Sequence, residues 1–326
     1  MKVGIDARSL RQGPPGVATY VRHLLAELPC LDPIDHPWPA NNLLWNQLRG
    51  LGGQLLRSWT AYHAPAYTAP LVNRCPVVLT VHDIAYLVKP EWYPYRLDRL
   101  RAAYYRRSLR VASRIIVPSG FSRQEVASRF PELAERIRVV PMGVGEEFFP
   151  DPEAAARVRE RYGLPGAYLL HVGDIHPRRR VDWVAAAGRA LGLPVVLVGR
   201  VLVGTPPPES AVRHLADLPL EDLRGVYSGA AALVYPSLYE GFGFPLVEAM
   251  ACGTPVVATR CASIPEVCAE AAVLVPPAAE AVRRGVQEAL NRRAELAAAG
   301  RQRAEQLSWR RTAELTAAVY REVAGG

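Results

Sequence analysis

Several features that mark other classes of protein are scarce or missing in this chain of 326 residues. There are five cysteines and no CxxC pair, and an odd number of scattered cysteines argues against a disulfide framework. No apolar run approaches the length of a membrane-spanning helix. The sequence passes from Met1 and Lys2 directly into an apolar segment, without the pattern of a secretory signal. We therefore expect a globular protein of a reducing, cytoplasmic compartment.

Lysine is also scarce, since Lys2 and Lys89 are the only two and arginine carries nearly all of the positive charge. The net charge is +8 and the pI is near 9.4, which favours an anionic ligand or surface. Nucleic acid is not the expected partner, because no pattern of a nucleic-acid-binding module is present. The GxGxxG fingerprint of dinucleotide-binding enzymes is absent too, which disfavours a nicotinamide dehydrogenase.

One segment, Arg96–Arg114, concentrates seven arginines against the single acidic residue Asp98. Its apolar residues lie near helical spacing and predict a basic amphipathic helix; they are Leu97, Leu100, Tyr104 and Val111. Such a helix would bind an anionic membrane surface, which would place the protein peripherally at the inner face of the plasma membrane. The alternative is an ordinary solvated helix face.

Short apolar segments alternate with helical patterns along the whole chain, which predicts an α/β fold with doubly wound, Rossmann-like parallel sheets. The strands are expected at residues 3–5, 76–81, 114–117 and 137–140, and then at 168–172, 195–198, 231–234, 255–258 and 272–275. We expect one domain over residues 1–150 and a second over 151–308, with a linker near 146–155. The proline-rich residues 31–43 are predicted to be connection only, so that the first domain is shortened around 30–45.

The segment from Tyr235 to Thr259 combines two carboxylates with a glycine-flanked loop and a helix start. Gly241 and Gly243 allow positive φ angles and close approach of a ligand, and a proline two residues further on fits the first helical turn. Backbone amides at a helix start bind phosphate, and the carboxylates of Glu240 and Glu248 accept hydrogen bonds from hydroxyls. A sugar nucleotide carries both kinds of group.

This segment, with Glu240-Gly-Phe-Gly-Phe-Pro-Leu-Val-Glu248 followed by Ala-Met-Ala-Cys-Gly-Thr-Pro, resembles the signature of the retaining glycosyltransferases of family 4. The resemblance implies the GT-B fold, in which two Rossmann-like domains face each other across a deep cleft. It also implies that the terminal helix, residues 309–326, crosses back onto the N-terminal domain.

The resemblance assigns roles residue by residue. Glu240 and His82, the latter in a His-Asp pair with Asp83, would act at the transferred sugar. Glu248 would bind the ribose. The donor diphosphate would be bound by Arg178, Arg179, Gly16, Gly241, Phe242 and Gly243. Arg179 stands where relatives usually have lysine, and guanidinium groups in any case bind phosphate oxygens bidentately.

Segments around His82 and residues 90–94 look most like bacterial mannosyltransferases of polysaccharide assembly. We therefore expect a hexosyltransferase with GDP-mannose as donor, or a UDP-sugar instead, and a glycan, lipid-linked or small-molecule acceptor. No cofactor and no metal are expected, because arginines can neutralise the diphosphate. The implied mechanism is same-side attack with the departing phosphate accepting the proton. A sugar-nucleotide epimerase and a non-catalytic sugar-nucleotide or glycan-binding protein remain alternatives.

Overall fold

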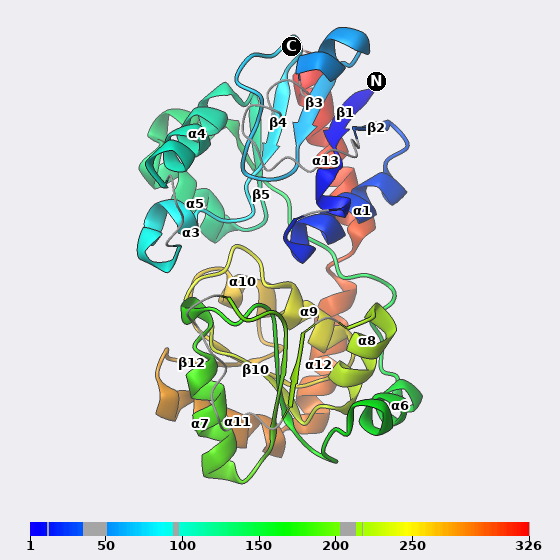
Figure 1. Cartoon of the computed structure of the whole chain (residues 1–326), viewed down its shortest axis with the longest axis vertical. Helices are drawn as coiled ribbons and strands as arrows, with labels where there is room; N and C mark the ends of the chain where they lie inside the picture. Colours follow the sequence, from blue (N-terminus) through cyan, green and yellow to red (C-terminus); the bar gives the residue numbers. More distant parts are fainter. Residues whose placement is uncertain (12, 35–50, 94–97, 203–212, 217, 326) are drawn as a thin grey trace. The chain divides into compact units, whose positions relative to one another are not determined.

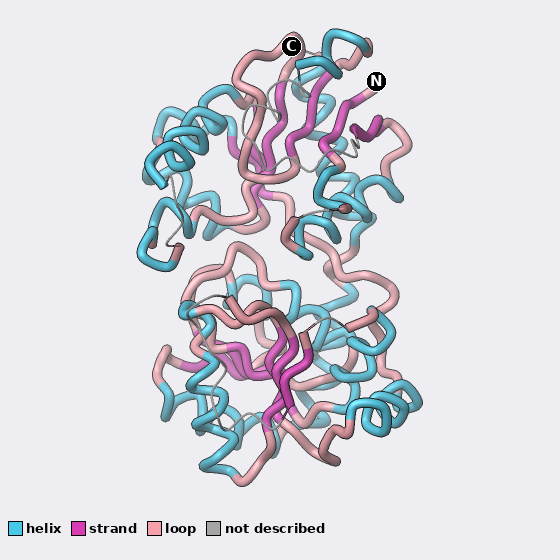
Figure 2. The backbone as a smooth tube through the Cα atoms, viewed as in Figure 1, coloured by secondary structure: helices cyan, strands magenta, loops and turns pink. Residues whose placement is uncertain are grey.

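The computed structural model describes the chain except residues 12, 35–50, 94–97, 203–212, 217 and 326 (Figure 1). It divides into two compact units, Met1–Gly143 together with Trp309–Gly326, and Val144–Ser308. Within the described residues, each unit is built on a parallel sheet of six strands with helices around it (Figure 2). The α/β class with two Rossmann-like sheets, as predicted from the alternation of apolar segments, is confirmed.

The first unit has the strand order β2-β1-β3-β4-β5-β6. The strands are β1 (Val3–Asp6), β2 (Leu31–Ile34), β3 (Ala61–Ala64), β4 (Val77–Thr80), β5 (Arg114–Val117) and β6 (Ile137–Val139). The prediction that residues 31–43 are only connection is wrong for residues 31–34, which form β2. Among the described residues this strand pairs only with β1, at the edge of the sheet, where Pro33 is tolerated because no described neighbour on its other side needs its missing amide. Residues 35–43 lie outside the described part of the chain.

The described helices of the first unit connect these strands. They are η1 (Arg8–Leu10), α1 (Pro15–Glu27), a helical segment over residues 51–56, α3 (Ala85–Val88), η2 (Pro90–Trp92), α4 (Asp98–Val111), α5 (Gly120–Arg129), η3 (Pro131–Arg136) and α13 (Trp309–Ala324). The last of these lies beside α1, where the Trp309 ring stacks on His23 at 4.5 Å (Figure 1). Tyr320 of α13 is fully buried, and its hydroxyl lies 2.6 Å from Nδ1 of His63 on β3.

The second unit has the strand order β12-β11-β10-β7-β8-β9. Its strands are β7 (Leu169–Val172), β8 (Val195–Val198), β9 (Arg213–Leu215), β10 (Ala232–Tyr235), β11 (Val256–Thr259) and β12 (Val273–Val275). All but β9 coincide with predicted strands. The sequence Arg-His-Leu of β9 is too short and too polar to stand out, since this edge strand has its arginine and histidine exposed.

The helices of the second unit follow the strands in alternation. They are α6 (Pro152–Tyr162), η4 (Pro177–Arg179), α7 (Val181–Leu191), α8 (Leu220–Gly229), α9 (Phe244–Ala251), α10 (Ile264–Cys268), α11 (Ala279–Asn291) and α12 (Arg293–Glu305). Asp151 caps α6, so helix begins inside the stretch 146–155 that the sequence predicts as linker. The buried core of this unit packs β-branched side chains of the strands against α7 and α11.

The basic helix α4 differs in part from its prediction. Tyr104 is buried as expected, but Leu100 is 60% exposed, and Leu97 lies outside the described residues. Arg114 is not helical; it begins β5 and pairs with Glu322 at 2.9 Å. Five arginines of α4 are exposed, at positions 99, 101, 106, 107 and 110.

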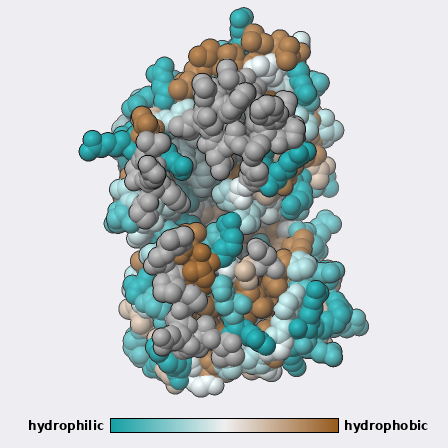
Figure 3. All heavy atoms as spheres, in the orientation of Figure 1, coloured by the Kyte–Doolittle hydropathy of each residue, from teal (hydrophilic) through white to brown (hydrophobic). Residues whose placement is uncertain are grey.

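The surface of the described residues is mixed in character. Hydrophilic side chains are spread over the visible face, between smaller hydrophobic areas (Figure 3). Within the described part of the chain, no helix is both apolar enough and long enough to cross a bilayer.

Candidate active site

The motif that dominates the sequence forms a strand, a loop and a helix in the second unit. Strand β10 ends at Tyr235, the loop runs over residues 236–243, and α9 begins at Phe244. Gly243 closes the loop with φ +99°, and a Cβ at this position would lie 2.8 Å from Leu246 Cδ1. Both facts require glycine here, because an L side chain would be strained and would clash. The loop therefore has a fixed shape that leads directly into the helix.

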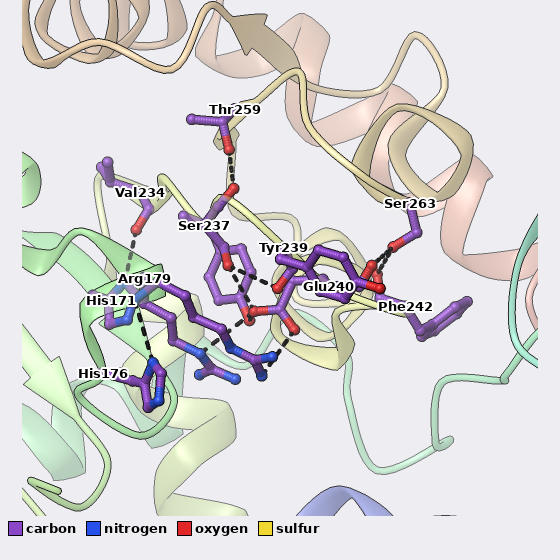
Figure 4. Close-up of polar contacts among 12 residues, drawn as sticks. His171, His176, Arg179, Val234, Ser237, Tyr239, Glu240, Phe242, Thr259 and Ser263 are labelled. Atoms are coloured by element: carbon purple, nitrogen blue, oxygen red, sulfur yellow. Dashed lines mark hydrogen bonds and ion pairs between the residues drawn. The ribbon is translucent and has the colours of Figure 1, made fainter. Parts of the chain in front are cut away.

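Glu240 lies at the centre of this loop and is buried, with 5% exposure (Figure 4). Its Oε1 accepts hydrogen bonds from the Tyr235 hydroxyl at 2.9 Å and from the Ser237 hydroxyl at 2.8 Å. Two guanidinium groups also approach it, Arg178 Nη2 at 3.6 Å from Oε2 and Arg179 Nε at 3.4 Å from Oε1. The carboxylate predicted to act at the sugar and the arginines predicted to bind phosphate thus form one charged cluster.

Burial by itself would raise the pKa of the Glu240 carboxyl. Arg178 and Arg179, with the hydroxyls of Ser237 and Tyr235, outweigh that effect and hold the pKa below its usual range. Glu240 is therefore ionised at neutral pH, and the cluster of one carboxylate and two guanidinium groups carries a net positive charge. This is the electrostatic character that suits a doubly or triply charged anionic ligand.

The two arginines are held by the turn η4, which follows β7. His176 caps this turn, since its Nδ1 accepts from the Arg178 amide at 3.2 Å, and the Arg178 carbonyl accepts from the Leu238 amide at 2.8 Å. The Arg179 guanidinium lies against Gly173, where a Cβ would come within 1.5 Å of Nη1. That Nη1 is buried and has no hydrogen-bond partner among the described residues. An unsatisfied charged donor in this place has the chemistry to bind an anion's oxygen.

The backbone of the glycine loop is oriented by two hydroxyl side chains. Ser263 Oγ donates to the carbonyls of Glu240 at 2.9 Å and Phe242 at 3.3 Å, and Thr259 donates to the Ser237 carbonyl. The carbonyls of Ser237, Glu240 and Phe242 are thereby satisfied. The amides of residues 241–243 donate to no other described residue. Consecutive free amides beside two guanidinium groups form a cradle for phosphate oxygens.

Glu248 lies on α9 and is partly accessible. Its Oε2 accepts from the Tyr227 hydroxyl at 2.7 Å. Burial raises the pKa of Glu248 to about 7; the Tyr227 hydrogen bond opposes this shift and the Glu147 carboxylate adds to it. Unlike Glu240, this carboxyl pairs with no arginine among the described residues, so it changes charge near neutral pH.

His82 belongs to the first unit, directly after β4. Its Nε2 donates to the Pro65 carbonyl at 2.8 Å, and the Tyr20 ring meets it edge-on at 5.3 Å. Burial lowers the pKa of His82, although the Pro65 carbonyl and Asp83 oppose the shift, so the ring is neutral and Nδ1 carries the lone pair. The Pro65 carbonyl therefore fixes the tautomer of His82. Asp83 instead accepts from the Ala85 amide at 3.0 Å, at the start of α3.

The remaining predicted site residue, Gly16, lies in the first turn of α1, which Pro14 and Pro15 introduce.

Several side chains that contribute to the site were not predicted from the sequence. His171 is fully buried on β7, its ring stacks on Tyr235, and its Nε2 has no partner among the described residues. Burial, and to a smaller extent the charge of Arg179, lowers the pKa of His171 to about 4. Tyr235 and Ser237 precede Glu240 in the sequence, but only the loop's path makes them its hydrogen-bond donors. Among the described residues, no three His, Cys, Asp or Glu side chains are grouped as metal ligands would be.

Comparison with known proteins adds independent findings. Residues 10–148 match the model of Glycosyltransferase Family 4, and residues 153–292 match that of Glycosyl transferases group 1. The chain is 33% identical over 234 residues to O-antigen chain mannosyltransferase B of Escherichia coli, covering 66% of this chain and 61% of that protein. It is 30% identical over 299 residues to alpha-maltose-1-phosphate synthase of Mycolicibacterium smegmatis. This match covers 79% of this chain and 76% of that protein. The chain thus spans about three fifths of the first relative and about three quarters of the second.

Solved structures agree in fold. The sucrose-phosphate synthase of Thermosynechococcus elongatus superposes with a TM-score of 0.79 at 21% identity, covering 100% of this chain and 99% of that one. The Anabaena protein HepE, solved in complex with UDP-glucose, superposes with a TM-score of 0.71 at 17% identity. The superposition covers 100% of this chain and 98% of that one. The chain belongs to the family 4 glycosyltransferases and has the fold class of the GT-B enzymes.

Proposed function

We propose that this protein is a retaining, metal-independent hexosyltransferase that moves a sugar from a nucleotide-sugar donor to a glycan or lipid-linked acceptor. The observation that carries the proposal is the cluster of Glu240, Arg178 and Arg179 beside the free amides of the glycine loop. It offers one ionised hydrogen-bond acceptor for sugar hydroxyls and several donors for a diphosphate. Both are needed at the same bond of a sugar nucleotide.

The reaction breaks the bond between the anomeric carbon and the phosphate oxygen, and the electron pair stays on that oxygen. Arg178, Arg179 and the amides of residues 241–243 would stabilise the charge that develops there. The acceptor hydroxyl would attack from the side the phosphate leaves and pass its proton to the departing phosphate oxygen, so that configuration is retained. Gly16, at the start of α1, would allow the diphosphate close to the backbone of the first unit.

His82 and Glu248 would position the two ends of the donor. His82 Nε2 is engaged by Pro65, which leaves Nδ1 to accept a hydrogen bond from a hydroxyl of the transferred sugar. Glu248 would accept from the ribose hydroxyls through the carboxylate oxygen that Tyr227 does not occupy.

GDP-mannose is the donor we favour, since a relative at 33% identity is an O-antigen chain mannosyltransferase. The fold-level neighbour HepE, solved with UDP-glucose, keeps a UDP-sugar as the second candidate. The epimerase and the non-catalytic binding protein are not favoured. Two relatives are named as mannosyltransferases, and the chain holds Glu240 together with both arginines.

The first experiment is a calorimetric titration with GDP, UDP and ADP and their common sugars, with and without EDTA. We expect one base to bind selectively, with no loss in EDTA. Incubation of that donor with a mannose-containing acceptor, followed by NMR of the new anomeric centre, tests transfer and retention together. Inversion at that centre would exclude the retaining mechanism, and binding that EDTA abolishes would exclude metal independence.

We also propose that α4 rests on an anionic membrane surface. Its exposed arginines and the exposed Leu100 give it a basic face with an apolar residue. Each basic residue near such a surface contributes about 1 kcal/mol. A membrane-bound acceptor would then be presented to the protein at this helix.

A further inference from the structure

Four tyrosine side chains form a connected cluster on the first unit, and none of them is explained by the reaction proposed above. Ring centroids of Tyr67 and Tyr105 are 5.7 Å apart, those of Tyr105 and Tyr86 are 5.3 Å apart, and those of Tyr86 and Tyr93 are 6.0 Å apart. All four side chains are partly exposed. This tyrosine cluster draws on the loop after β3, on α3, on the end of η2 and on α4.

The cluster continues directly to His82. The Tyr67 ring lies 5.8 Å from the His82 ring, and the same loop supplies the Pro65 carbonyl that fixes the tautomer of His82. A ligand lying on these rings would therefore reach the residue that we place at the transferred sugar. This position is where an acceptor has to be bound.

The loop that carries Tyr67 is held in an unusual conformation. Tyr67 has φ +50°, in the left-handed region that a bulky aromatic residue rarely adopts. Two buried residues of α4 anchor the loop, because Tyr104 donates to the Ala69 carbonyl at 3.0 Å and Ser108 accepts from the Ala69 amide at 3.1 Å. Strain of this kind persists only where the surrounding contacts hold it, and it is concentrated at ligand-binding positions.

Partly exposed phenol rings have the chemistry to bind a saccharide. The face of a pyranose ring presents C–H groups that lie well on an aromatic face, while its hydroxyls bond to polar groups at the edge. Tyrosine supplies a rigid ring and a hydroxyl on the same side chain at low conformational cost. A row of such rings suits a chain of sugars, since successive residues can lie on successive rings.

We propose that the tyrosine cluster is the binding subsite for a saccharide acceptor, so that the acceptor is recognised through its sugar rings. This proposal rests on the proposed transferase function and narrows the acceptor to a glycan, attached to a carrier or free. Tyr67 and Tyr105 bind the sugar rings nearest His82, and Tyr86 and Tyr93 extend the surface.

The test uses the full chain and an α-linked mannotriose as the probe, with binding measured by calorimetry and by saturation-transfer NMR. Tyr105→Ala and Tyr67→Ala should each weaken binding about tenfold, the scale of one lost aromatic stacking contact. Tyr105→Phe and Tyr67→Phe should retain it. Tyr105→Leu keeps apolar bulk without a ring and should behave like alanine, which separates stacking from folding. Tyr162→Ala on α6 is the matched control, and binding should be unchanged.

Several outcomes would overturn the subsite. They are wild-type protein that does not bind mannotriose, alanine variants that bind it normally, and alanine variants that lose GDP binding instead, since the rings would then stack on the nucleotide base. The two proposals fail separately. A wild type that binds mannotriose through the tyrosines but transfers no sugar refutes the transferase and leaves the subsite. A wild type that transfers with the same acceptor KM in every variant refutes the subsite alone.

Discussion

Individual residues at the site differ in charge because their immediate neighbours differ. Glu240 in the loop is buried and Glu248 on the following helix is partly accessible. Glu240 faces two guanidinium groups, whereas Glu248 faces a hydroxyl and another carboxylate. The first is therefore held ionised, and the second has a pKa of about 7. Spacing in the sequence makes the pair visible, whereas only the neighbours reveal that the two groups have different chemistry.

Replacing Glu240 by glutamine should reduce sugar transfer by a factor of about 100 or more, in the range seen when one oriented polar group is removed from a transition state. The variant should also melt at a lower temperature, because two largely buried guanidinium groups lose their counter-charge. Steady-state rates and thermal unfolding measure the two effects. Glu295→Gln, at an exposed arginine pair, is the control. Full transfer activity in Glu240→Gln would refute its role.

Donor binding should depend on pH through Glu248. Its folded pKa of about 7 lies above the ordinary value of 4.5, so the charged form that ribose hydroxyls prefer is lost as pH falls below 7. Affinity for GDP-mannose should therefore rise several-fold between pH 6 and pH 8, following a carboxyl with a pKa of about 7. Calorimetry across this range tests the expectation.

Two variants make that experiment specific. Glu248→Gln should bind more weakly and show no such pH dependence. Tyr227→Phe removes a hydrogen bond that lowers the pKa of Glu248, so its midpoint should move to higher pH. An unchanged profile in Glu248→Gln would mean that another group causes the pH dependence.

Among the elements, helix α4 has one face packed on the first unit and one exposed face. Its buried residues Tyr104 and Ser108 hold the loop after β3, while its arginines are exposed. The helical spacing in the sequence predicts an amphipathic helix. It misplaces Leu100, which the helix turns outward, because spacing alone does not say which turn of a helix the core covers.

Reversing charges on α4 should weaken attachment to anionic lipid. Arg106→Glu with Arg107→Glu should reduce co-sedimentation with vesicles of phosphatidylglycerol and phosphatidylcholine at least tenfold, since each basic residue contributes about 1 kcal/mol. Arg283→Glu with Arg284→Glu on α11 supplies a control of equal charge. Equal loss in both double variants would indicate a general charge effect and no specific role for α4.

At the scale of the whole molecule, the chain leaves the first unit at Gly143 and returns to it at Trp309. The returning helix contributes to that unit's core, where the Tyr320 hydroxyl meets His63 and Thr80 meets the other ring nitrogen at 2.8 Å. Burial lowers the pKa of His63 to about 3, so the ring stays neutral. The stability of the first unit therefore depends on the last residues of the chain.

Tyr320→Phe should destabilise the first unit by about 1–3 kcal/mol, because it leaves a buried imidazole nitrogen without its partner. Hydrogen exchange should report faster opening in residues 1–143 and 309–325, with residues 144–308 unaffected. The reciprocal control is Tyr168→Phe, whose buried hydroxyl donates to Val226 in the second unit at 2.7 Å. Opening of both units in Tyr320→Phe would show that they unfold as one.

The sequence by itself determined the alternation of strands and helices, the family, and the motif around Glu240, because each of these depends on local pattern and on residues adjacent in the chain. The sequence analysis missed three strands. The edge strand β2 contains a proline, β3 contains two alanines and a histidine, and the edge strand β9 is polar, so none of them shows the apolar pattern of a buried strand. Only the tertiary structure decided that the Pro65 carbonyl, rather than the adjacent Asp83, fixes the tautomer of His82. It also decided that both arginines meet Glu240, and that four tyrosines distant in sequence form one surface. Those contacts join residues across different strands and helices, and the path of the backbone in space sets them.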